Sequence, residues 1–264
     1  IGSLLMGYVN VDLAARTLDA IVRCIEEDGV LLEDCGYGRA TTLPNILAHV
    51  ALNLYRQAAD VKWLKRWFVP LRLSWRQQYR YPTWKRFGTP LCRNYFYAYF
   101  NGQALLEIAR AIRRPAAEIR DIEDRLRDIR TMVQAFWNHD AGYFRAQIFT
   151  QVGSCAHFEP VEGTNGELLI GVYSDVVKPE QRSAMLATIR EEMLYGRYMV
   201  ANVPNRKPAL DTGTPGKNAN PDFAIKPSNY LYLWPGIRAN DPELFRTVVD
   251  RTLAGVAEAN EFSE

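Results

Sequence analysis

Residues 61–106 combine cationic and aromatic side chains in a pattern that could bind an anionic ligand. The segment holds nine lysines and arginines and no aspartate or glutamate. Aromatic rings beside arginine suit a sugar that carries a carboxylate or a phosphate, and they suit single-stranded nucleic acid equally. A structural interpretation is also open, in which the cations pair with acidic faces of neighbouring helices and the rings fill the core. We rank the structural interpretation first, a small anionic ligand second and nucleic acid third.

Histidine and cysteine give no sign of a metal site. The three histidines, His49, His139 and His157, include no pair at ligand spacing on one helix. We expect His49 to be a hydrogen-bonded core residue and His139 to lie at a helix C-terminus, where an imidazolium favours the helix dipole. The sequence contains no Cys-x-x-Cys pair, no Gly-x-Ser-x-Gly elbow and no glycine-rich phosphate loop. We therefore predict no metal and no other cofactor.

Composition indicates a globular protein with a substantial core. The chain has 264 residues, of which 48% are hydrophobic, and its net charge of +2 gives no general attraction to nucleic acid or an anionic membrane. No apolar run approaches the roughly 18 residues of a membrane span, and scattered cysteines favour a reducing compartment. We expect a soluble, cytoplasmic protein without a membrane partner. Because it starts at Ile1 and stops at Glu264 without a polar tail, we also expect it to be truncated.

Helical periodicity dominates the chain, and strand patterns are few and short. Apolar residues recur at steps of three and four from Pro115 to Trp137, and the opposite face of this helix alternates in charge. Pro70 should kink or divide one helix, and Thr42 with Pro44 should begin another. The remaining expectations are helices at 18–25, 43–54, 61–79, 92–113, 179–194 and 241–258, strands at 143–150 and 198–203, and a long loop at 204–228.

One local pattern occurs twice. A helix runs into Glu27-Asp28-Gly29-Val30, and a later helix runs into Asp140-Ala141-Gly142-Tyr143-Phe144. In both cases glycine can supply a left-handed turn before a short extended segment. Glycine turns of this kind between helices are typical of helical-hairpin toroids. An ordinary helical bundle with glycine C-caps explains them equally well.

Several segments resemble, in order, features of glycoside hydrolase family 63 and its trehalase-like relatives. The strongest runs from Phe136 to Phe144 and looks like those enzymes' helix that ends in a Trp-Asp-x-x-x-Gly-Tyr-type turn. The resemblance implies an all-α fold, the (α/α)6 toroid, as a single domain over residues 1–264 with fewer helices than a complete toroid. Weaker matches lie at 14–29, 41–48, 58–71, 94–97, 107–110, 229–244 and 262–264.

The resemblance also implies an inverting glycosidase. Such a hydrolase needs one carboxylic acid to protonate the leaving oxygen and a second carboxylate, roughly 6.5 to 9.5 Å away, to activate water. Glu264 matches the position of the family's base, whereas the family's acid motif falls at residues 80–90, which contain no carboxylate. Loops that follow the two glycine turns can reach one rim of a toroid. The substitute acids that they offer are Glu33, Asp34, Glu159 and Glu162.

Aromatic, guanidinium and amide groups complete the predicted site. We expect Trp84 to stack on a sugar face and Arg86 to make a bidentate contact with an anion, while Asn94, Trp137 and Tyr230 lie in segments that match the family. The predicted function is a glycoside hydrolase acting on a small or anionic glycoside. The alternative is a non-catalytic helical protein that binds an anionic ligand through residues 61–100. A sugar isomerase is disfavoured because the chain has only three histidines.

Overall fold

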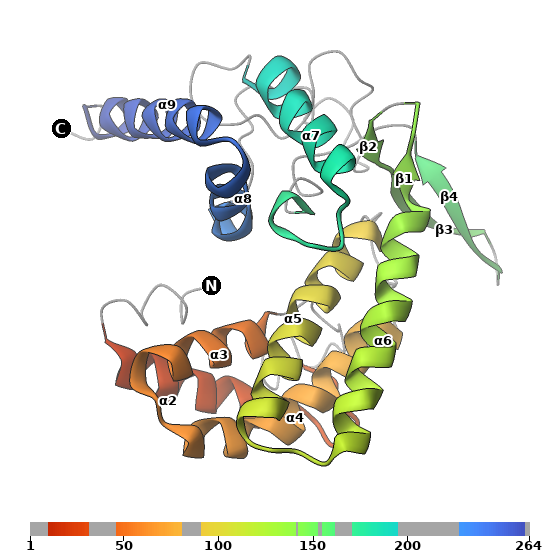
Figure 1. Ribbon diagram of the computed structural model, residues 1–264, viewed down its shortest axis with the longest axis vertical. Coiled ribbons are helices and arrows are strands. Elements are labelled where there is room, and N and C mark those ends of the chain that lie inside the picture. Colours follow the sequence, from red (N-terminus) through yellow and green to blue (C-terminus); the bar gives the residue numbers. More distant parts are fainter. Residues whose placement is uncertain are drawn as a thin grey trace. The chain divides into compact units, whose positions relative to one another are not determined.

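The computed structural model describes residues 10–31, 46–80, 91–140, 142–152, 155–161, 171–194 and 227–261 (Figure 1). The chain divides into two compact units. Unit 1 comprises residues 1–84 and 94–132, and unit 2 comprises residues 85–93 and 133–264. The single domain expected from the sequence stays a prediction.

Unit 1 is built from helices. α2 shows how the sequence sets them: the side chain of Asn10 accepts a hydrogen bond from the Leu13 amide at 2.9 Å, which caps the helix. The buried residues of α2, among them Leu18 and Val22, then form one apolar stripe. The helices are α2 (Val11–Arg23), α3 (Leu47–Ala58), α4 (Val61–Arg80), α5 (Leu91–Ala111) and α6 (Ala116–Ala135), with the first residues of α5 and the last of α6 assigned to unit 2.

The core of unit 1 is rich in aromatic rings and packs closely around one glycine. A Cβ on Gly102 of α5 would lie 2.7 Å from both the Trp75 ring of α4 and a methyl carbon of Leu126 on α6. The Trp75 ring is held in place because its Nε1 donates a hydrogen bond to the Ala98 carbonyl at 2.7 Å. A residue without a side chain at position 102 therefore permits the three helices to pack.

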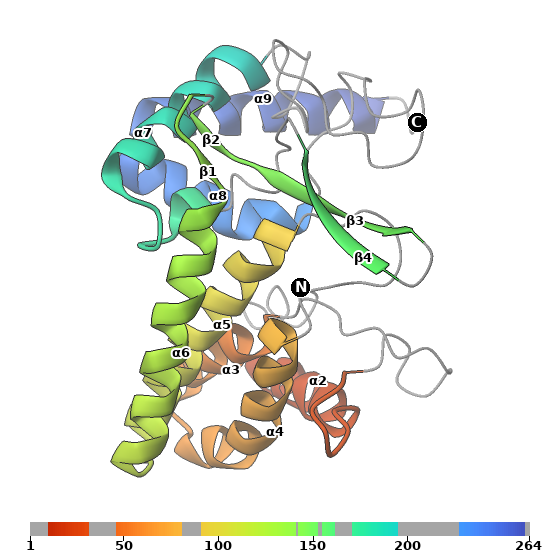
Figure 2. The same cartoon turned by 90° about the vertical axis from the view of Figure 1, so that its right-hand side faces the viewer.

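Unit 2 combines short antiparallel strand pairs with helices. β1 (Trp137–Asn138) pairs with β2 (Tyr143–Phe144), and β3 (Ala146–Val152) pairs with β4 (Cys155–Val161) to form the hairpin in Figure 2. The helices are α7 (Pro179–Thr188), α8 (Pro227–Asn240) and α9 (Pro242–Glu261), and the π-helical turn η2 (Ile189–Met193) continues α7.

Caps and close approaches fix the helices of unit 2. Asp241 caps α9, because its carboxylate accepts a hydrogen bond from the Leu244 amide at 3.0 Å. Gly236 of α8 lies against the 3-10 turn at residues 171–173, because a Cβ on Gly236 would lie 2.7 Å from the Tyr173 amide nitrogen. Gln134 at the end of α6 and Gln181 in α7 exchange side-chain amide hydrogen bonds of 2.9 and 3.1 Å.

Two expectations about the helices change in detail. Pro70 does not divide α4, which is one helix from Val61 to Arg80, and a kink at Pro70 stays a prediction. Pro70 has no amide proton to donate to the carbonyl of Arg66, and the helix continues without this one hydrogen bond. α3 begins at Leu47 rather than at Thr42, because Ile46 has a non-helical conformation.

The strand expected at 143–150 is present as β2 and β3, whereas its partner β4 was not expected. β4 was missed because its sequence, CAHFEPV, lacks a clean apolar alternation and contains a proline. The strand expected at 198–203 and most of the loop expected at 204–228 lie outside the described residues.

Candidate functional site

The chain reverses direction after α6 in the second glycine turn of the sequence. Gly142 has a φ of 68°, a left-handed conformation that favours glycine. The Asn138 side chain accepts a hydrogen bond from the Asp140 amide at 3.1 Å, and the Asn138 carbonyl accepts one from Gly142 at 2.9 Å. These bonds set β1 against β2 and thereby fix the backbone of Trp137, which pairs with Phe144.

Trp137 is the best-defined of the predicted site residues. Its partly exposed indole packs edge-to-face on Phe144, with ring centroids 4.9 Å apart, and Phe144 is itself 1% exposed. The exposed imidazole of His139 also lies beside the indole, with the ring centroids 6.4 Å apart and the ring planes perpendicular. The buried phenylalanine thus anchors an indole that remains accessible to a ligand.

His139 does not lie where the sequence predicted it. α6 ends at Ala135, and His139 follows β1 within the turn, so it is not in the last turn of the helix and the expected helix-dipole interaction is wrong. Its ring contacts Trp137 instead. The contact could have been predicted from the sequence, because two aromatic side chains, Trp137 and His139, lie two residues apart just before a glycine turn.

The predicted acids and base fall mostly outside the described residues. Glu159 lies in β4, where it pairs with Ile148 of β3. For this residue the structure describes the backbone and not the side chain. The predicted catalytic residues that are not described are Glu33, Asp34, Glu162 and Glu264.

The predicted ligand contacts are placed only in part. Asn94 lies in the first turn of α5, and Tyr230 lies in the first turn of α8, both described at the level of the backbone. Trp84 and Arg86 lie outside the described residues. Trp137 is therefore the one predicted site residue whose side chain is described, and the proximity of the others to it stays a prediction.

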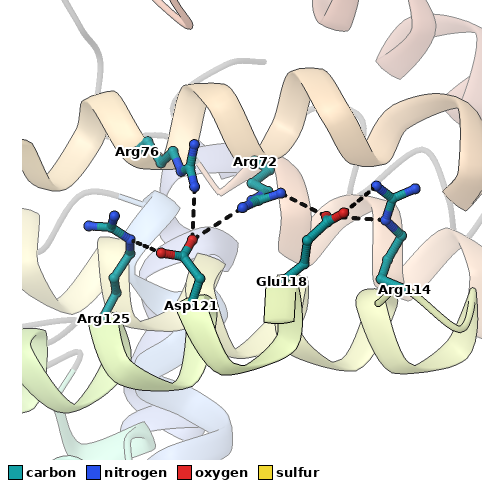
Figure 3. Close-up of polar contacts among 6 residues, drawn as sticks. All are labelled: Arg72, Arg76, Arg114, Glu118, Asp121 and Arg125. Carbon is teal, nitrogen blue, oxygen red and sulfur yellow. Dashed lines mark hydrogen bonds and ion pairs between the residues drawn. The ribbon is translucent and has the colours of Figure 1, made fainter. Parts of the chain in front are cut away.

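The arginines of the basic segment whose side chains are described pair with acidic residues of neighbouring helices. Arg72 of α4 contacts Glu118 at 2.7 Å and Asp121 at 3.2 Å, both on α6 (Figure 3). Arg76 contacts the same Asp121 carboxylate at 2.9 Å. Earlier in α4, Arg66 contacts Asp19 of α2 at 2.7 Å. These contacts are the ones expected if the cations of the segment have a structural role and pair with acidic faces of neighbouring helices.

The cluster around Asp121 keeps its carboxylates ionised. Burial alone would raise the pKa of Asp121, but hydrogen bonds from Arg76, Arg125 and Arg72 outweigh it and lower the pKa to about 2. The hydrogen bond from Arg114 is the main cause that lowers the pKa of Glu118. The arginines are thus engaged in joining α4 to α6 rather than held free for a ligand.

The aromatic rings of the segment also have structural roles. The Trp67 indole donates a hydrogen bond to Asp19, and the Arg66 guanidinium lies 5.7 Å from its ring centroid. Nearly every described ring is buried, whereas Lys62 and Lys65 are exposed. The buried rings are Trp67, Phe68, Trp75, Tyr95, Phe96, Tyr99 and Phe100. The ligand-binding interpretation of this segment therefore depends on residues 81–90, which lie outside the described part of the chain.

His49 has the surroundings of a core residue. Its imidazole is largely buried, and burial lowers its pKa, with Arg56 adding to the effect and Glu107 opposing it. A lowered pKa keeps the ring neutral near pH 7. Among the described residues no group of three histidine, cysteine, aspartate or glutamate side chains could hold a metal ion. None of the described helices is long and apolar enough to cross a membrane.

Comparison with known proteins gives matches by structure alone. No family model matches the sequence, and no curated protein matches it. The glycoside hydrolase family 63 mannosylglycerate hydrolase from Thermus thermophilus, solved in complex with glucose, superposes with a TM-score of 0.74 at 12% identity, covering 97% of this chain and 82% of that one. The same hydrolase with Tris and D-glycerate gives a TM-score of 0.67, covering 96% and 81%.

A further similar structure is an uncharacterized conserved protein from Thermus thermophilus, with a TM-score of 0.72, 12% identity and coverage of 92% and 79%. These similarities establish that the chain has the all-α toroid fold of family 63 glycosidases. The resemblance to this family predicted from the sequence is confirmed at the level of fold. At 12% identity the comparison establishes the fold and does not establish the activity.

Proposed function

We propose that this chain is a glycoside hydrolase that cleaves a small, anionic glycoside with inversion at the anomeric carbon. The observation that carries the proposal is the similarity to mannosylglycerate hydrolase over 97% of the chain, with a TM-score of 0.74. That enzyme has been crystallised with glucose and with D-glycerate, a carboxylic acid. A sugar joined to a small hydroxy acid is the substrate class that follows.

The proposed reaction requires two carboxyl groups with different tasks. Water attacks the anomeric carbon as the base takes its proton, the bond to the leaving oxygen breaks, and the acid gives its proton to that oxygen. We assign Glu264 as the base. The acid is one of Glu33, Asp34, Glu159 and Glu162, since residues 80–90 hold no carboxylate.

The remaining predicted residues would bind the two parts of the substrate. Trp84 and Trp137 offer faces for a sugar ring, and Arg86 offers a guanidinium for the carboxylate. Asn94 and Tyr230 offer hydrogen-bonding groups at the starts of α5 and α8. We further propose that the chain acts as one domain, in the cytoplasm and without a cofactor.

Turnover of mannosylglycerate tests the proposal. The Glu264→Gln variant should lose at least about two orders of magnitude in kcat, because a carboxamide cannot accept the proton of water. One of the variants Glu33→Gln, Asp34→Asn, Glu159→Gln and Glu162→Gln should lose a similar factor. Glu180→Gln changes an exposed carboxylate at the start of α7 and is the matched control, which should retain full activity.

A second function makes a different prediction for the same substrate. If the chain is a non-catalytic binding protein, isothermal titration will show mannosylglycerate binding without product formation. The absence of an acid motif at residues 80–90 is the feature that favours this alternative. Wild-type turnover that is lost in Glu264→Gln would exclude it, and equal turnover in both proteins would overturn the assigned base.

A further inference from the structure

Trp137 and His139 form an aromatic corner within unit 2. Their ring centroids are 6.4 Å apart and their planes are perpendicular, so one ring presents its face beside the edge of the other. Both side chains come from a single stretch of three residues between α6 and β2. Both rings of the corner therefore come from one short segment of unit 2.

The polar atoms of this corner are available to a ligand. The indole Nε1 of Trp137 and the imidazole nitrogens of His139 make no hydrogen bond within the described part of the chain, and neither residue is among its buried groups that lack a partner. The indole can donate one hydrogen bond, and the imidazole can donate one and accept one. A polyhydroxylated ligand could use all three without displacing an internal contact.

The corner is held in one geometry before a ligand arrives. Phe144 is 1% exposed and packs edge-to-face on the indole with the ring centroids 4.9 Å apart, which restrains the Trp137 side chain. The left-handed Gly142 and the Asn138 hydrogen bonds fix the turn that carries His139. A preorganised site of this kind loses little conformational entropy when it binds.

We propose that this corner binds the sugar ring of the substrate, with Trp137 stacking on its apolar face and His139 hydrogen-bonding to a ring hydroxyl. This inference rests on the proposed glycoside hydrolase function and adds His139 as a specificity-determining residue. Stacking requires an apolar C–H face and is tolerant of the sugar, whereas a hydrogen bond from a fixed imidazole depends on the position of one hydroxyl. His139 is thus the residue that discriminates among sugars.

Glucose binding, measured by isothermal titration, tests the stacking partner. Trp137→Ala should raise the Kd for glucose by about tenfold or more, as expected for loss of a buried aromatic contact. Trp63→Ala is the matched control, because Trp63 is another partly exposed tryptophan packed on an aromatic ring, Trp67, but it lies in unit 1. The Kd of the Trp63→Ala variant for glucose should equal that of the wild type. An unchanged Kd in Trp137→Ala would overturn the proposal.

Kinetics with mannosylglycerate tests His139. His139→Ala should raise KM by about tenfold with kcat little changed, because the hydrogen bond acts in binding, and His139→Gln should restore most of the loss through its amide. A structural role would lower the melting temperature and leave KM unchanged. A KM in His139→Ala within twofold of wild type would therefore reject the assignment.

The two proposals can fail separately. If wild type binds glucose through Trp137 but releases no sugar from mannosylglycerate, the corner stands and the hydrolase proposal falls. If wild type hydrolyses mannosylglycerate while both corner variants behave as wild type, the hydrolase stands and the corner falls. Wild type that neither binds glucose nor hydrolyses the substrate would overturn both.

Discussion

The two glycine turns share their local structure and differ in what surrounds them. Gly29 and Gly142 have φ values of 91° and 68°, both left-handed. In each turn an Asp or Asn side chain accepts a hydrogen bond from the backbone amide two residues later. Asp28 accepts from Val30 at 2.9 Å, and Asn138 accepts from Asp140 at 3.1 Å. After each turn the chain returns antiparallel to the segment that it left.

Their tertiary surroundings separate them. A Cβ on Gly29 would lie 2.6 Å from the carbonyl carbon of Leu73 in α4, and Gln77 of the same helix donates a hydrogen bond to the Asp28 carbonyl. Among the described residues, the nearest atom to a Cβ on Gly142 is the Ala184 Cβ at 3.6 Å, an ordinary contact. One local sequence pattern thus serves a packed structural turn in unit 1 and a more open turn in unit 2, which presents Trp137 and His139.

The largest difference should appear on adding a methyl group to Gly29. Gly29→Ala forces a left-handed alanine into the backbone of α4, so we expect it to reduce the free energy of unfolding by roughly 3 kcal/mol or more. Urea denaturation followed by circular dichroism measures this. A loss below about 1 kcal/mol would show that α4 is not packed on the turn as described.

The same substitution in the second turn should cost less. Gly142→Ala carries the backbone penalty alone, about 1 to 2 kcal/mol, because no atom of the described residues lies close enough to clash. Gly142→Asn should be milder still, since asparagine tolerates the left-handed region. Equal losses for Gly29→Ala and Gly142→Ala would remove the distinction between the two turns.

Acid should weaken the framework of the first turn through the cluster around Asp121, which holds α4 to α6. The pKa of Asp121 is lowered to about 2 in the folded protein. The ionised carboxylate therefore adds fully to the free energy of unfolding above about pH 4, the usual pKa of an aspartate, and this contribution is lost as the pH falls through about 2. After allowance for solvent screening we expect about 1 kcal/mol. Urea denaturation of wild type and Asp121→Asn at pH 5 and pH 2.5 measures it. A stability difference that does not shrink at the lower pH would contradict this account.

The smallest effects should come from the side-chain hydrogen bonds that the turns share. Asp28→Ala and Asn138→Ala each remove one acceptor for a backbone amide near solvent, so we expect similar losses of about 0.5 to 1 kcal/mol. Thermal denaturation of the two variants compares them directly. A loss several times larger in one of them would mean that the turns differ locally as well as in their packing.

Much of the fold could be predicted because it depends on local sequence. The apolar period of 115–137 gives α6, and the glycines at positions 29 and 142 give both turns. The contact between Gly29 and Leu73 joins residues far apart in the chain, and no local pattern encodes it. For the same reason the sequence alone left the partners of Arg72 and Arg76 open.

The site was less predictable than the fold. Trp137 was found through a resemblance, and its anchoring by Phe144 follows from the register of β1 and β2. His139 was assigned to a helix end because the end of α6 could not be located to the residue, and a shift of a few positions moves it into the turn. The carboxylates proposed for catalysis come from distant segments, so their separation is a tertiary property that sequence spacing does not specify.

The central claim is that the chain hydrolyses an anionic glycoside with inversion. The most direct test is to incubate the wild-type protein with mannosylglycerate and follow the released sugar by proton NMR before it mutarotates. The account predicts that mannose first appears as the anomer opposite to that of the substrate. First release of the same anomer, or no release from protein that binds the substrate, would contradict it.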